Sequence, residues 1–108
     1  MKTEKIINVS TILAVVILMR FRFANFLGGI ASAGQAVLGV PVSNFDAGEQ
    51  AGVATHGEIL VEAGAAIAVG AEVESDATGR AITKTTGQSA GRARDAATAA
   101  GEYIRVLR

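Results

Sequence analysis

The chain has 108 residues, which is the size of one small domain. Its ten basic and ten acidic residues give a formal net charge of zero, which argues against nucleic acid or an anionic membrane surface as the main ligand. Cysteine is absent, which excludes disulfides, thiolate nucleophiles and Cys-based metal sites; with 50% apolar but only 5% aromatic residues, the core must consist of Val, Ile, Leu and Ala.

The first ten residues predict an extended arm. Ile6 and Ile7 lie between charged residues, among them Lys2 and Lys5. An arm that becomes ordered on binding covers a large surface, although a frayed terminus or an edge strand is the alternative. We therefore expect an N-terminal arm at residues 1–10, followed by a single β-barrel-like domain at residues 11–108.

The next segment, residues 11–23, is predicted to be a strand. Its apolar part, TILAVVILM at residues 11–19, resembles the hydrophobic region of a signal peptide. Arg20 and Arg22 interrupt that run, however, and it is shorter than the roughly 20 apolar residues of a membrane helix. We expect a buried strand, or two strands joined by a bend, with both Arg on one face and both Phe on the other.

Short β-prone runs alternate with Gly-containing turns through the rest of the chain. An Ala-rich segment at residues 95–100 predicts a loop or a single helical turn, because six residues are too few for a stable helix. The spacing of the runs predicts an all-β fold, a small β-barrel or sandwich of short strands. The expected strands cover residues 36–42, 53–62 with a break near Gly57, 71–75, 80–84, 89–94 and 102–107.

Part of the sequence is repeated. LGVPV at residues 38–42 leads to AGE at 47–49, and AGRAR at 90–94 leads to AGE at 100–102. The corresponding glycines are 52 (91 − 39) and 53 (101 − 48) residues apart. The repetition predicts two related β units that face each other in one barrel.

One pentapeptide fits a catalytic pattern. GQSAG at residues 87–91 matches G-x-S-x-G, which needs a preceding strand, a following helix and a His after the Ser. The chain has one His, His56, which precedes Ser89, and a β segment follows the motif. A lone His without Cys partners also predicts no metal site. We therefore expect no enzyme activity and no cofactor.

Two pairs of arginines are spaced for a shared strand face. Arg20 and Arg22, like Arg92 and Arg94, are two residues apart. Such pairs are usually solvated, but Arg also binds carboxylates of a partner through two hydrogen bonds.

Several short motifs follow one another in a specific order from Gly28 to the C-terminus. These motifs are LGV at residues 38–40, AGE at 47–49, Gly57 with ILVEAG at 59–64, IAVG at 67–70, SDATGRAIT at 75–83, and DAATAAGE at 95–102 before Val106 and Leu107. In this succession the sequence resembles the phage capsid decoration proteins, also called capsid cement proteins.

The resemblance implies a structural virion protein that binds the outer surface of the phage head and stabilises the lattice of the major capsid protein. It implies a homotrimer or homodimer on the capsid, with the host cytoplasm as the location before assembly and with neither nucleic acid nor membrane as partner. An N-terminal segment often makes the contacts in this family. The candidate contacts with capsid or neighbour are Lys2, Lys5, Ile6, Ile7, Arg20, Arg22, Arg92 and Arg94.

A different class of function stays open. A small β-barrel without catalytic groups also suits a non-catalytic adaptor or a glycan-binding module. Glycan sites usually present aromatic platforms, for which the chain offers Tyr103 and four Phe.

Overall fold

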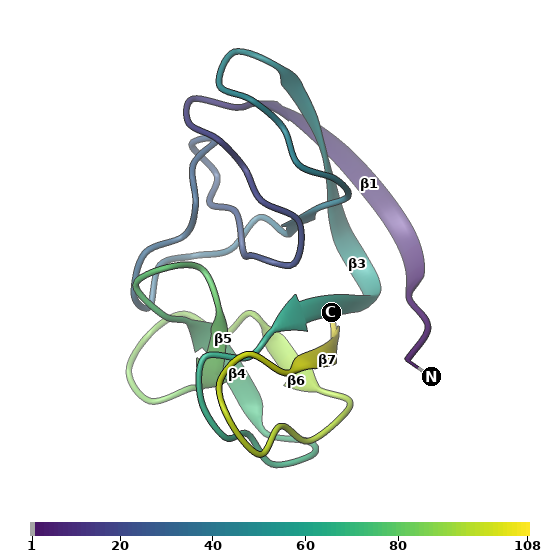
Figure 1. The fold of residues 1–108 in the computed structure, drawn as a ribbon, viewed down its shortest axis with the longest axis vertical. Coiled ribbons are helices and arrows are strands. Elements are labelled where there is room, and N and C mark those ends of the chain that lie inside the picture. The colour runs from purple at the N-terminus through teal and green to yellow at the C-terminus, as the bar shows by residue number, and fades with distance from the viewer. Residues whose placement is uncertain (1) are drawn as a thin grey trace.

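The computed structural model describes residues 2–108, which form strands and loops without a helix (Figure 1). Within these residues the strands make one antiparallel sheet with the order β1-β3-β7-β6-β4-β5, and β2 pairs with β3. This sheet path does not close on itself, so the all-β prediction is confirmed whereas a barrel is not. The strands are β1 (Lys5–Leu13), β2 (Val40–Pro41), β3 (Gln50–Glu62), β4 (Glu72–Ser75), β5 (Ala81–Thr83), β6 (Gly91–Ala93) and β7 (Tyr103–Leu107).

The longest strand, β3, connects the two halves of the molecule. Residues 50–58 pair with β1, and residues 58–62 pair with β7. Gly57 lies near the change of partner, with a φ of 126° that L side chains rarely adopt. A Cβ atom at Gly57 would approach the Lys5 carbonyl oxygen to 2.1 Å. The break predicted near Gly57 is therefore an irregular position inside one continuous strand.

The strand predicted over residues 11–23 is wrong beyond Leu13. β1 begins at Lys5 and ends at Leu13, so the predicted arm boundary at residue 10 falls inside it. The residues that follow β1 form loops held by isolated bridges. Ala14 and Leu18 point into a small core cluster with Ala51, whereas residues 15–17 between them are exposed. Because this cluster accepts few side chains, the apolar run does not continue as a buried strand.

The later elements agree better with prediction. Strands β3 to β7 each overlap the expected segment, and residues 95–100 form a loop. Only two residues of the strand expected at 36–42 are in β2. The main core consists of small and β-branched side chains around Phe23, as the composition predicts.

The repeat predicted from the glycine spacing is present in the backbone pairing. Pro41 of β2 lies opposite Val53, and Ala93 of β6 lies opposite Val106. These positions are 52 (93 − 41) and 53 (106 − 53) residues apart. Thus β2 pairs with β3 as β6 pairs with β7.

The correspondence extends into the loops, beyond the motifs seen in the sequence. Leu18 and Phe45 exchange two backbone hydrogen bonds of 2.9 Å, and Ile67 and Ala97 exchange two of the same length. Leu18 and Ile67 are 49 residues apart (67 − 18), and Phe45 and Ala97 are 52 apart (97 − 45). The chain therefore contains two structural repeats, which fill the upper and lower halves of Figure 1.

We name residues 5–55 the first repeat and residues 56–108 the second repeat. Their first strands keep the same register, since Ser10 lies opposite Val53 and Ile59 lies opposite Val106. β3 is shared, because its first part ends the first repeat and its last part begins the second repeat.

Candidate interaction surface

β1 forms an open edge of the sheet. Within residues 2–108 no strand pairs with its outer side. The side chain of Ile7 is 82% exposed, and Val9 and Leu13 are also exposed. Natural edge strands are usually protected by charges, proline or bulges; β1 has irregular pairing between Ile6 and Val9, but it carries one charge, on Lys5, and no proline. This edge offers backbone groups and apolar side chains to a partner.

A second group of apolar side chains lies beyond the end of β1. The Val15 N–H donates to the Gly28 carbonyl at 3.0 Å, which brings residues 26–27 near residues 15–17. All five side chains are between 46% and 75% exposed. Exposed apolar groups of this kind indicate a contact with another molecule. We call them the apolar patch: Val15, Val16, Ile17, Phe26 and Leu27.

The N-terminal candidate residues lie against the sheet. Lys5, Ile6 and Ile7 belong to β1, where Lys5 is opposite Glu58 of β3. Lys2 reaches the second repeat, because its Nζ donates to the Tyr103 carbonyl at 2.5 Å. In this structure the predicted arm is therefore mostly strand.

Each of the four candidate arginines faces a carboxylate of the chain itself. Arg20 and Arg22 follow β1 and do not share a strand face, in contrast to the prediction. Arg92 and Arg94 flank the buried Ala93, and both are exposed. The pairs are Arg20–Glu4 at 3.1 Å, Arg22–Glu62 at 3.3 Å, Arg92–Glu72 at 3.3 Å and Arg94–Glu58 at 3.4 Å.

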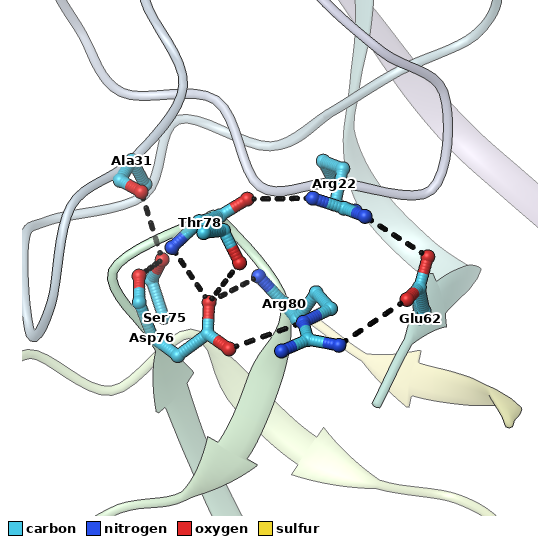
Figure 2. A network of polar contacts seen from close by, with 7 residues as sticks. All are labelled: Arg22, Ala31, Glu62, Ser75, Asp76, Thr78 and Arg80. Atoms are coloured by element: carbon cyan, nitrogen blue, oxygen red, sulfur yellow. Dashed lines mark hydrogen bonds and ion pairs between the residues drawn. The ribbon is translucent and has the colours of Figure 1, made fainter. Parts of the chain in front are cut away.

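Arg22 connects the two repeats (Figure 2). Its Nη1 donates to the Thr78 carbonyl at 3.0 Å, and its Nη2 donates to Glu62 Oε1 at 3.3 Å. The other oxygen of Glu62 lies 3.6 Å from Arg80 Nη1. Because these side chains are mostly buried, the network fixes the first repeat on the second.

Asp76 organises the loop between β4 and β5. Its Oδ1 accepts hydrogen bonds from the backbone N–H groups of Thr78 and Arg80, both at 2.8 Å. Burial raises the pKa of Asp76, but the hydrogen bonds from Arg80 and Thr78 lower it more, so that the pKa lies below its ordinary value. The ionised Asp76 therefore holds Arg80 in place for the contact with Glu62.

Phe21 lies in the contact between the repeats and has an unusual backbone. Its φ of 69° is positive, as at no other non-glycine residue among residues 2–108. The Phe21 carbonyl accepts from the Glu62 N–H at 2.9 Å, its ring lies 4.9 Å from the Tyr103 ring, and the Arg20 guanidinium lies 4.7 Å from its centroid. The equivalent residue, 49 positions later (70 − 21), is Gly70 with a φ of 82°.

The comparison with Gly70 explains this conformation. The turn requires a left-handed residue in both repeats, and the first repeat places a Phe there, where its ring packs on the second. Inspection of the sequence missed Phe21 as a contact residue. Aligning the two repeats as far as residues 21 and 70 would have paired Phe21 with a glycine, and this pairing would have indicated a turn at Phe21.

A pocket opens beside this aromatic pair. Its volume is about 560 Å³, and it is mostly apolar. Its lining residues are Lys2, Phe21, Leu60, Glu102 and Tyr103. The pocket therefore lies where the two repeats meet.

The residues of the catalytic pattern have ordinary local partners. Ser89 Oγ accepts from the Gly91 N–H at 3.4 Å, and His56 Nδ1 lies 3.0 Å from Thr55 Oγ1. Among residues 2–108 no group of three His, Asp or Glu side chains is placed to hold a metal ion. In this part of the chain there is likewise no helix of the length and apolar character that crossing a membrane requires.

The comparisons with known proteins identify a family. Residues 14–108 match the family model of the phage cement proteins. The match begins at Ala14 and so includes the apolar patch and Arg20–Arg22, which the resemblance from Gly28 did not cover. No curated protein matches the chain. Since the match extends over most of the sequence, the chain belongs to the phage cement protein family, a family of structural proteins of the phage capsid.

Proposed function

We propose that this protein binds the outer surface of the phage head and stabilises the lattice of the major capsid protein. Membership of the cement family is the observation that carries the proposal. The open edge of β1 and the apolar patch support it, because both surfaces need a partner. In this proposal the protein is located in the host cytoplasm before assembly and acts on the virion surface as a homodimer or homotrimer.

The residues that are candidates for contact with the shell differ in how exposed their side chains are. Ile7, Arg92 and Arg94 have side chains that are more than half exposed. Lys5 and Ile6 belong to the β1 edge, Arg20 pairs with Glu4 just before it, and Lys2 reaches Tyr103 in β7 of the second repeat. Arg22 is the least exposed of the four arginines and acts mainly between the repeats. We therefore expect Ile7, Arg92 and Arg94 to contribute most to the contact with the shell.

The physical basis of stabilisation is multivalency. A shell presents many identical sites, so contacts that are weak singly hold the lattice together when one protein bridges neighbouring subunits. A net charge of zero adds little repulsion between copies that lie close together.

The direct test is binding to heads of the phage that encodes this chain, prepared without it. We expect the purified protein to co-sediment with these heads, to saturate at a fixed ratio to the major capsid protein, and to raise the temperature at which the heads release DNA. Protein that stays in the supernatant at every concentration would contradict the proposal.

A glycan-binding function is the second candidate, and one observation favours it. Phe21 and Tyr103, two of the five aromatic residues, line the same pocket. A glycan-array signal that Tyr103→Ala removes would support this function. Head binding without any array signal would exclude it as the main role.

A further inference from the structure

The contact between the two repeats covers one particular strand edge. The Glu62 N–H donates to the Phe21 carbonyl at 2.9 Å, and the Leu60 N–H donates to Glu4 Oε2 at 2.9 Å. Both N–H groups point away from β7, which pairs with the other side of this part of β3. Phe21 of the first repeat and Glu4, just before that repeat, therefore cover the outer edge of the first strand of the second repeat.

The equivalent edge of the first repeat is open up to Leu13, where Gly28 lies against the Leu13 carbonyl and accepts from the Val15 N–H. Thr11 and Leu13 correspond to Leu60 and Glu62, 49 residues later (62 − 13). Because the two strands keep the same register with their partners, the N–H groups of Thr11 and Leu13 point away from β3. Within residues 2–108 no strand pairs with this edge, and the Leu13 side chain is 50% exposed.

The second repeat contains an exposed loop that corresponds to the loop covering the edge inside the chain. Val69–Ala71 corresponds to Arg20–Arg22, and both loops close with the same backbone hydrogen bond: Ala71 N–H to Ala68 at 3.2 Å and Arg22 N–H to Met19 at 3.4 Å. Val69 is 65% exposed. The carbonyl of Gly70 accepts from Arg92 Nη1 at 3.0 Å and keeps a second lone pair for another donor.

The side chains on the free loop and the free edge match each other chemically. Inside the chain, Arg22 of the loop meets Glu62 of the strand as an ion pair of 3.3 Å. The equivalent of Glu62 is Leu13, and the equivalents of Arg20 and Arg22 are Val69 and Ala71. Both sides of the second contact therefore carry apolar residues where the contact inside the chain has charged ones, so the two surfaces suit each other.

We propose that the Val69–Ala71 loop of one copy docks on the β1 edge of a second copy, repeating between chains the contact that joins the two repeats within one chain. The Leu13 N–H then donates to the Gly70 carbonyl of the neighbouring copy, and Val69 packs on Leu13. This inference rests on the proposed function, in which the protein forms a homo-oligomer on the head. It specifies which surfaces join the copies.

This contact uses two different surfaces of the protein. Each copy contributes one edge and one loop, so the copies form either an open chain or a closed ring, and a ring of two copies would be a dimer in which the contact is made reciprocally. The alternative of antiparallel pairing between two β1 strands would leave the Val69–Ala71 loop exposed.

Cysteine cross-linking tests the arrangement, since the natural chain has no Cys. We expect the double variant Leu13→Cys/Val69→Cys to form disulfide-linked multimers on oxidation, while each single variant stays monomeric on a non-reducing gel. The matched control is Leu107→Cys/Val69→Cys, because Leu107 is 49% exposed and Leu13 50%. The control is expected to give no multimers, and all variants are expected to keep the circular dichroism spectrum of the natural protein.

The cross-linking is measured on the free protein at high concentration and on head-bound protein, and head binding is scored separately by co-sedimentation. Multimers of the 13–69 pair in either state, with none in the control, support the inference. Their absence in both states, or dimers of the Leu13→Cys single variant, would overturn it. Cross-linking without head binding would leave the inference standing and refute the proposed function.

Discussion

At the scale of single residues, Gly57 illustrates how the backbone limits the sequence. Its φ is 126°, and a Cβ atom would meet the Lys5 carbonyl at 2.1 Å. Gly48 is a matched control, since its φ is 91° and a Cβ atom there meets nothing within 4 Å. Gly48 therefore separates the effect of backbone strain from the effect of the clash.

We expect Gly48→Ala to lower the free energy of unfolding by about 1 kcal/mol through strain alone. Gly57→Ala causes the same strain and also pushes β1 away from β3. We therefore expect it to lower the free energy of unfolding by about 3 kcal/mol or more. Denaturant unfolding of both variants measures the difference. Equal losses would show that β1 is not held closely against Gly57.

Asp95 makes the stability of the protein depend on pH. Arg105 Nε and Nη2 donate to Asp95 at 2.9 and 2.8 Å, and these hydrogen bonds hold the pKa of Asp95 well below its usual range. The folded state therefore favours the ionised carboxylate. Its contribution to stability is complete above the unfolded pKa of about 3.9 and is lost as the pH falls below that value towards the folded pKa.

We expect Asp95→Asn to be less stable than the natural protein at pH 7, and the difference in unfolding free energy to shrink as the pH is lowered from about 5 to 2. Thermal unfolding across this range measures it. A difference that stays constant with pH would mean that the Asp95 charge does not contribute.

At the scale of elements, the ion pair between the repeats is more protected than the pairs on the surface. The side chains of Arg22 and Glu62 are 22% and 18% exposed, whereas those of Arg92 and Glu72 are 63% and 42% exposed. A double-mutant cycle with Ala should give a coupling energy of about 1 kcal/mol for the first pair and near zero for the second. Equal couplings would contradict the view that Arg22 fixes one repeat on the other.

The strands that sequence patterns predicted correctly are those with one buried face. β3 and β7 alternate between buried and less buried residues, and both were found close to their expected bounds. The prediction for residues 11–23 was wrong because an apolar run indicates hydrophobic side chains but does not show whether other parts of the chain cover them. Val15, Val16 and Ile17 are as apolar as core residues, yet they are exposed in this structure.

The site was predicted less well than the fold, for a related reason. Charge and spacing singled out Arg20 and Arg22, but the partners of these residues lie far along the chain. The left-handed Phe21 between them leaves no local pattern, because aromatic residues rarely adopt that conformation. Only the repeat, which pairs Phe21 with Gly70, contained this information.

At the scale of the whole molecule, the exposed apolar side chains are the feature that a partner must explain. Ile7 is 82% exposed in β1, so Ile7→Asp should leave the unfolding free energy within about 0.5 kcal/mol of the natural value. A charge at a desolvated contact should nevertheless weaken head binding at least tenfold in a co-sedimentation titration. Ala100→Asp, in an exposed loop, is the control for an added charge. Equal binding by both variants would remove Ile7 from the contact.

The structure thus combines a modest core of small side chains with surfaces that favour assembly. Two repeats share β3, one strand edge is covered within the chain, and the equivalent edge is open. A structural protein of the capsid needs such a rigid unit and many equivalent contacts more than it needs a reactive group.

Cryo-electron microscopy of the head of the phage that encodes this chain tests the central claim most directly. We expect density for the two repeats on the outer surface, at many symmetry-related positions and in contact with more than one major capsid subunit. A head of the same phage without this density, while the chain is present elsewhere in the virion or absent from it, would contradict the proposed role on the capsid surface.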